Sequence, residues 1–118
     1  MRISDDVEMY LKYYMENICI LGKLQISAIQ NLVLYKGQGS EYISCSYNPE
    51  DEDYKEGYVT LYFWKPAAEQ DTMVFVDNYK FYNCLIEIVS KFIKEDAKVK
   101  DVLTGYLEQI KTDLGIKE

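Results

Sequence analysis

The sequence predicts a single α+β domain, residues 1–118, in which a small antiparallel sheet packs against a C-terminal αα-hairpin with an N-terminal helix alongside. Three observations lead to this fold class. Apolar residues recur at helical spacing near both ends of the chain, strand-like alternation occupies its middle, and short polar turns separate the segments. A chain of 118 residues is long enough to bury one sizeable core without disulfides or metals.

The first helix is expected to begin at Ser4, whose hydroxyl can cap it ahead of two acids in the first turn. Its apolar stripe consists of Val7, Tyr10, Leu11, Tyr14 and Ile18. Gly22 interrupts the pattern. Residues 24–33 then fit a second short helix, with an extended run over residues 31–35 as the alternative. A glycine-rich loop follows at residues 37–39.

Three strands are expected in the middle of the chain, at residues 42–47, 58–64 and 72–76. The first alternates apolar and polar residues with a period of two, and the third is short and apolar. The second is rich in β-branched and aromatic residues and is apolar on both faces, which is typical of a central strand. Pro66 ends it, because proline cannot donate to a strand ladder. The short connections favour antiparallel hairpins.

Two amphipathic helices complete the chain. The first spans residues 77–95, with Asp77 as its N-cap, and its apolar face consists of Phe81, Cys84, Leu85, Ile88, Val89 and Phe92. The second stops at Gly115, and its apolar face consists of Val99, Val102, Leu103, Tyr106, Leu107, Ile110 and Leu114. Joined by a short turn they form an αα-hairpin, whose apolar faces need the sheet.

The composition argues against several functional classes. A net charge of −7 lacks the basic footprint that nucleic acid or an anionic membrane requires, and it fits a basic protein partner. The absence of histidine removes the commonest general base and metal ligand. No phosphate-cradling glycine motif occurs either. We therefore expect no enzymatic activity, no metal, no cofactor and no small-molecule substrate.

Two features indicate a cytoplasmic protein. No apolar run approaches the ~20 residues that span a bilayer, and the N-terminus carries acids where a signal peptide would carry basic residues. Cys19, Cys45 and Cys84 are widely spaced and lie among apolar residues, so they are expected to be buried free thiols.

The most unusual segment is residues 48–57, which joins the first two predicted strands. It contains five acids and one lysine, and so carries −4 of the net charge of −7. It could be a solvated hairpin loop or a calcium loop, although the acid and glycine order of an EF-hand is absent. It could also be a recognition loop that steers a basic partner toward neighbouring aromatic residues. On the last hypothesis the partner-binding residues are Glu50, Asp51, Glu52, Asp53, Tyr54, Glu56 and Tyr58.

The tyrosines around this segment have two possible roles. Tyr58, Tyr62 and Trp64 could pack beneath the N-terminal helix, against its Tyr10 and Tyr14. Alternatively they could be exposed beside the acidic loop, where Tyr and Trp often anchor a protein partner. The sequence does not decide between the two faces.

The C-terminal half also resembles a known family. An aromatic strand TLYFW, a short strand TMVFV and the helical stretch over residues 77–116 are similar to the ribonuclease-toxin immunity proteins of bacterial contact-dependent growth inhibition (CDI) systems. The likeness rests on Tyr79, Phe81 and Tyr82 where the first of these helices opens, and on Tyr106, Leu107, Ile110 and Lys111 in the last helix. Residues 26–33, Gly37 and residues 44–47 extend it to most of the chain.

This resemblance implies an intracellular inhibitor that binds the nuclease domain of a cognate toxin and blocks its active site or its access to RNA. It transfers no contact residues, because the toxin-facing surface varies within the family. Two other classes stay open on the residues alone: a small carboxylate-based hydrolase, which needs two acids converging in an apolar pocket, and a self-associating adaptor.

Overall fold

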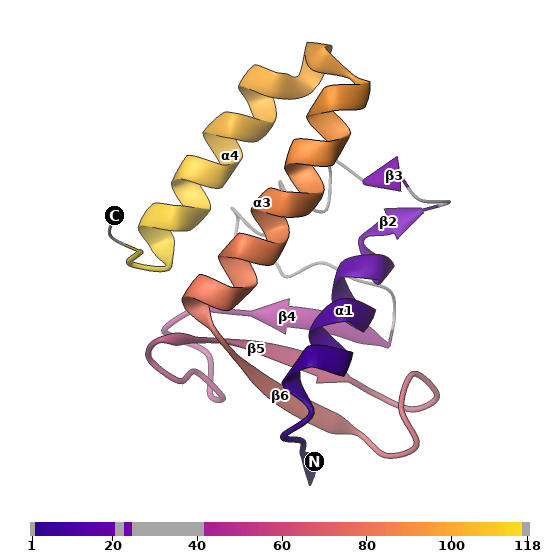
Figure 1. Cartoon of the computed structure of the whole chain (residues 1–118). Coiled ribbons are helices and arrows are strands. Elements are labelled where there is room, and N and C mark those ends of the chain that lie inside the picture. Colours follow the sequence, from indigo (N-terminus) through magenta and orange to yellow (C-terminus); the bar gives the residue numbers. More distant parts are fainter. Residues whose placement is uncertain (1, 21–22, 25–41, 117–118) are drawn as a thin grey trace.

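A computed structural model of the chain describes residues 2–20, 23–24 and 42–116 (Figure 1). Its strands are β1 (Arg2–Ile3), β2 (Cys19–Ile20), β3 (Lys23–Leu24), β4 (Ile43–Ser46), β5 (Tyr58–Phe63) and β6 (Thr72–Asp77). Its helices are α1 (Val7–Asn17), α3 (Asn78–Glu95), the short 3-10 helix η1 (Ala97–Val99) and α4 (Lys100–Asp113). The predicted α+β architecture is confirmed: a main sheet, a C-terminal α3–α4 hairpin, and α1 beside them.

The main sheet has the strand order β1-β6-β5-β4. The three predicted strands pair antiparallel through short connections, and β5 is central, as its two apolar faces predict. In this ladder Leu61 lies opposite Cys45 on one side and Val74 on the other. The unpredicted β1 runs parallel to β6, so the whole sheet is mixed rather than purely antiparallel.

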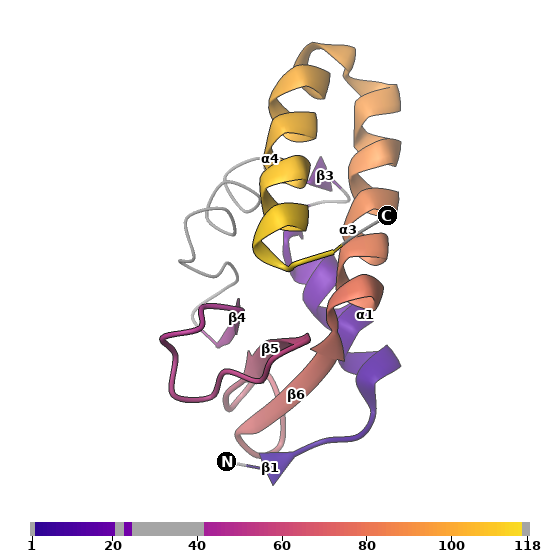
Figure 2. The same ribbon diagram turned by 90° about the vertical axis from the view of Figure 1, so that its left-hand side faces the viewer.

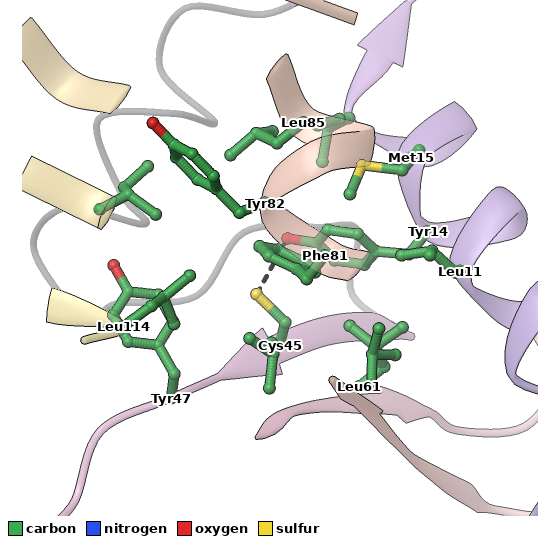
Figure 3. Packing of buried hydrophobic residues seen from close by; sticks show 14 of the residues in the cluster. Leu11, Tyr14, Met15, Cys45, Tyr47, Leu61, Phe81, Tyr82, Leu85 and Leu114 are labelled. Atoms are coloured by element: carbon green, nitrogen blue, oxygen red, sulfur yellow. Dashed lines mark hydrogen bonds between the residues drawn. The ribbon is translucent and has the colours of Figure 1, made fainter. Parts of the chain in front are cut away.

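The inner face of the sheet carries the core. Val59, Leu61 and Phe63 of β5 are fully buried on it, and α1 and α3 cover it. The ring of Tyr10 packs on that of Phe63 at 4.8 Å between centroids. Figure 3 shows the core near α3, where the Tyr14 hydroxyl and the Cys45 thiol are hydrogen-bonded at 3.0 Å. A tyrosine tip thus enters the core with its hydroxyl satisfied.

Because successive side chains of a strand point to opposite faces, Tyr62 and Trp64 lie on the outer face, away from α1. The possibility that they pack beneath the N-terminal helix is therefore wrong. Tyr10 and Tyr14 instead pack on Phe63 and Phe81, at centroid distances of 4.8 and 6.0 Å.

Helix ends follow the expected chemistry with one correction. Asp77 caps α3, and its Oδ1 accepts from the backbone N–H groups of Tyr79 and Lys80. Gly115 follows α4 with a φ of +71°, a conformation that favours glycine. The cap of α1, however, is Asp6 and not Ser4. Ser4 lies two residues before Asp6, and its Oγ accepts from the Asp6 N–H.

Residues 24–33 lie almost entirely outside the described part of the chain. Leu24 alone is described, and it pairs with Cys19 in the small antiparallel β2–β3 sheet rather than opening a helix. The possible extended run over residues 31–35 and the glycine-rich loop fall in the same undescribed stretch.

Two cysteine predictions can be compared with the structure. Cys45 is a buried free thiol, as expected, whereas the free thiol of Cys84 is only half-buried. Partial burial and the neighbouring Glu87 raise the pKa of the Cys84 thiol. Within the described residues, no helix is long and apolar enough to cross a membrane.

Candidate functional site

The acidic loop, residues 48–57, connects β4 to β5 and folds back on itself through short turns (Figure 2). The backbone N–H of Asp51 donates to the Asn48 carbonyl at 2.9 Å, and that of Tyr54 donates to the Asp51 carbonyl at 3.1 Å. Asn48 Oδ1 also accepts from the Glu50 N–H at 3.0 Å. Residues 50–57 are all exposed, so these turns present five carboxylates to solvent.

Side chains of the outer sheet face fasten the acidic loop over β4 and β5. Ser46 Oγ donates to Asp51 Oδ2 at 2.5 Å, and the Tyr62 hydroxyl donates to Asp53 Oδ2 at 3.2 Å. Thr60 Oγ1 donates to the Asp53 backbone carbonyl at 3.3 Å, and Thr60 is 2% exposed as a result of this cover. The loop is therefore seated on the sheet, whereas a simple solvated hairpin turn would project away from it.

An aromatic pair lies beside these carboxylates. The rings of Tyr62 and Trp64 stack with a centroid distance of 5.4 Å and an interplanar angle of 4°. With Asp51 and Asp53 they line a hollow of about 340 Å³ on the outer face. Burial and the negative charges of Asp51 and Asp53 raise the pKa of the Tyr62 phenol, so the phenol stays protonated and keeps donating to Asp53.

Lys55, the lysine of the acidic loop, makes cation–π contacts with two aromatic rings. Its Nζ lies 4.3 Å from the ring centroid of Tyr58 and 5.1 Å from that of Phe75. A cation over a ring face is attracted by the ring quadrupole. The loop's one positive charge is thus held against the outer sheet face, which leaves the negative charge of the loop facing outward.

A second hollow, of about 420 Å³, lies at the other end of the acidic loop. Tyr54, Glu56 and Tyr58 contribute to its lining, together with residues at the start of α3 and the end of α4. The predicted partner-binding residues therefore divide between two neighbouring hollows: Asp51 and Asp53 line the first, and these three line the second. Glu50 and Glu52 are exposed on the loop itself.

Sequence reasoning left several lining residues out of the candidate set. Tyr62 and Trp64 were noted as aromatic neighbours, and the period of two could have placed them together on one strand face. Tyr79 and Asp113 come from α3 and α4, and join Tyr54 only through the tertiary fold. No local pattern marks them as neighbours of the loop.

The geometry of the acidic loop can be compared with two alternatives from the sequence, a carboxylate-based hydrolase and a calcium loop. Asp51 and Asp53 share a hollow, but both are exposed and each accepts a hydrogen bond from a hydroxyl group. They do not lie in the apolar setting that a carboxylate-based hydrolase needs. Across residues 2–20, 23–24 and 42–116, no group of three or more acids or cysteines is arranged to hold a metal ion.

A small α+β domain that presents clustered carboxylates beside half-buried aromatic rings has the surface of a protein-binding module. A comparison with known families shows which kind of protein-binding module this is. The chain belongs to the CDI immunity protein family, whose model matches residues 7–107, most of its length. Membership of this family gives the chain an immunity role, in agreement with the resemblance seen in its sequence. Neither a curated protein nor a solved structure matches the chain.

Proposed function

We propose that this immunity protein binds the basic nuclease domain of a cognate toxin, specifically an RNase, through its acidic loop and the adjoining aromatic residues. Binding neutralises the toxin by blocking its active site or its access to RNA. The observation that supports this proposal is the exposure of five carboxylates on one short loop that is fastened to an aromatic sheet face. The protein performs no chemistry itself, and acts in the cytoplasm, where the RNA is.

The physical basis is complementarity of charge and shape. An RNA-cleaving enzyme holds phosphates with lysine and arginine side chains, so its active site is basic. Clustered carboxylates raise the association rate with such a surface and compete with RNA for the same cations. Desolvated aromatic residues commonly supply most of the binding energy at the centre of an interface. Tyr54, Tyr62 and Trp64 are placed to contribute here.

The test is recovery of the partner. The chain is isolated from its native host cell in moderate salt, and the polypeptides that co-purify with it are identified. We expect a stoichiometric basic polypeptide whose RNase activity is lost when the purified chain is added back. Recovery of no such polypeptide, including after co-expression with the product of the neighbouring open reading frame, would overturn the proposal.

A control separates inhibition from simple self-association. Sedimentation of the purified chain at several concentrations should give a constant size, because the proposal requires no second copy of this chain. A concentration-dependent increase in size, with no basic partner recovered, would favour the self-associating adaptor instead.

A further inference from the structure

The second hollow combines residues from three elements at one end of the molecule. Tyr54 and Glu56 come from the acidic loop, Tyr79 comes from the first turn of α3, and Asp113 is the last residue of α4. Figure 2 shows the end of α4 lying above this loop. At about 420 Å³ the hollow is too small for a segment of secondary structure and has room for a single long side chain.

The charge of this hollow favours a cation. Glu56, Asp77 and Asp113 are among its lining residues, and no lysine or arginine is among the described residues that line it. The C-terminal turn of α4, which ends at Asp113, also contributes the negative end of its helix dipole. Asp77 Oδ1 caps α3 and Asp113 Oδ1 accepts from Gln109, so the exposed Glu56 is the carboxylate best able to pair with an incoming cation.

Two lining residues carry buried oxygens that lack a hydrogen-bond donor. Asn78 Oδ1 and Asp113 Oδ2 are buried, and neither has a partner among the described residues. The remaining side-chain polar atoms of both residues are engaged: Asn78 Nδ2 donates to the Leu114 carbonyl, and Asp113 Oδ1 accepts from Gln109 Nε2, both at 2.9 Å. These bonds orient both groups. Buried acceptors without donors are costly, so an N–H donor that reached either oxygen would stabilise the complex.

Aromatic rings complete the hollow. Tyr54 is 38% exposed and Tyr79 is 51% exposed, so both rings have surface that is open to a partner. An exposed tyrosine face attracts a cation, and a flat guanidinium can stack on it. Acids, unpaired acceptors and ring faces are together the features that recognise arginine.

We propose that this hollow receives one arginine side chain of the toxin, an inference that rests on the function proposed above. A guanidinium offers five N–H donors in a planar fork, so one group can pair with a carboxylate, satisfy a buried acceptor and lie against a ring. A lysine ammonium is a compact point charge with three donors and stacks less well. The hollow thereby holds the toxin at a defined position, while the exposed carboxylates of the acidic loop steer it there.

The first experiment uses a probe that does not depend on the toxin. A capped Gly-Arg-Gly peptide is titrated into the protein labelled with ¹⁵N, and backbone amide shifts are followed by NMR. The matched control peptide carries citrulline, which has nearly the same shape without the charge. We expect saturable shifts at Glu56, Tyr79 and Gly115 with arginine, a dissociation constant of about 1–10 mM, and no comparable response to citrulline. Equal shifts with both peptides, or arginine-induced shifts absent from these amides, would overturn the inference.

Two variants locate the binding. Glu56→Gln removes a charge from the lining, and Tyr79→Ala removes an exposed ring; both positions are on the surface, so the fold should be retained. Each should weaken arginine peptide binding by about 5–10-fold. Glu69→Gln removes a carboxylate from the β5–β6 turn, outside this hollow, and should leave the affinity unchanged. If the Glu56→Gln protein binds the arginine peptide as tightly as the unaltered protein does, the hollow is excluded as the binding site.

The same variants separate this inference from the proposed function. If a basic RNase is recovered and binds the Glu56→Gln and Tyr79→Ala proteins as tightly as the unaltered chain, the immunity function stands and the arginine site fails. If the arginine peptide binds as expected but no RNase partner is recovered, the hollow stands and the proposed function fails.

Discussion

Tyr62 illustrates how the acidic loop acts on a single residue. Its phenol is partly buried on the outer sheet face, stacked on Trp64, and donates to Asp53. Burial disfavours a phenolate, and the negative charges of Asp51 and Asp53 disfavour it further, so the pKa of Tyr62 is raised above its ordinary value of about 10. The hydroxyl therefore stays a donor throughout the neutral and mildly alkaline range.

This shift has a measurable consequence for Tyr62. The raised pKa means that the folded state favours the neutral phenol of Tyr62. The contribution of this phenol to folding stability is therefore present below pH ~10, and it is lost as the pH rises through the pKa of the folded state. Subtracting the alkaline absorbance titration of Tyr62→Phe from that of the unaltered protein should give a step above pH ~10. Circular dichroism over the same range checks that the fold persists.

Asp53→Asn provides the control for the cause of the shift. Removing the carboxylate charge should move the Tyr62 step to lower pH, although not fully to its ordinary value, because burial is the largest contribution. A Tyr62 step at pH ~10 in the unaltered protein, or no change on Asp53→Asn, would contradict this account of the loop.

At the scale of elements, the helix that follows the sheet depends on one capping residue. Asp77 is the last residue of β6 and also the N-cap of α3, where its Oδ1 accepts at 2.9 Å from the Tyr79 N–H and at 3.3 Å from the Lys80 N–H. Asp6 caps α1 through a single, longer bond of 3.4 Å to the Met9 N–H. The two caps therefore form a matched pair with unequal geometry.

Asp77→Ala should destabilise the protein by about 1 kcal/mol, because orphan N–H groups at the start of α3 lose their acceptor. Asp6→Ala should cost less, about 0.5 kcal/mol, since Asp6 accepts only the one capping bond and that bond is longer. Urea unfolding, read as a shift of midpoint at constant slope, measures both free energies. Equal losses for the two variants would show that cap geometry does not control their contributions.

The elements also show what a single sequence can predict. The strands β4, β5 and β6 and the helices α3 and α4 were predictable because their periods of two and 3.6 are local properties. The two-residue strands β1 and β2 are too short to show a period. The strand β1 pairs with β6, far along the chain, through backbone bonds from the N–H groups of Arg2 and Ser4 to the carbonyls of Asp71 and Met73. The cap of α1 was misplaced because Ser4 and Asp6 both have cap chemistry.

At the scale of the whole molecule, the candidate site also has residues that the sequence could predict and residues that only the tertiary fold brings in. The carboxylates of the acidic loop could be found from the sequence because they are consecutive. The contributions of Tyr79 and Asp113 could not, since the fold alone brings the ends of α3 and α4 beside that loop. A composition can thus indicate a basic partner, whereas the shape that receives a particular side chain emerges only from the tertiary structure.

The uneven distribution of charge leads to a prediction about association with the toxin. The acidic loop carries −4 of the net −7, so it should dominate the field that steers a basic partner. Replacing Asp51 and Asp53 by lysine changes the net charge to −3 and brings the charge of the acidic loop from −4 to zero. We expect the association rate constant at low salt to fall about 10-fold or more, and its dependence on ionic strength to weaken. Stopped-flow mixing with the recovered toxin domain measures both.

Two further double variants identify the cause of that change. Glu50→Lys with Glu52→Lys makes the same change of charge in the loop but spares the hydrogen bonds of Asp51 and Asp53, so it should slow association to a similar extent. Glu95→Lys with Asp101→Lys makes an equal change in net charge at the α3–α4 turn, at the far end of the helical hairpin from the loop (Figure 1). Because the Debye length at physiological ionic strength is about 8 Å, this distant pair should have a much smaller effect. Equal slowing by all three pairs would mean that overall charge, and not the acidic loop, controls the encounter; an unchanged rate in the loop variants would remove the loop from the interface.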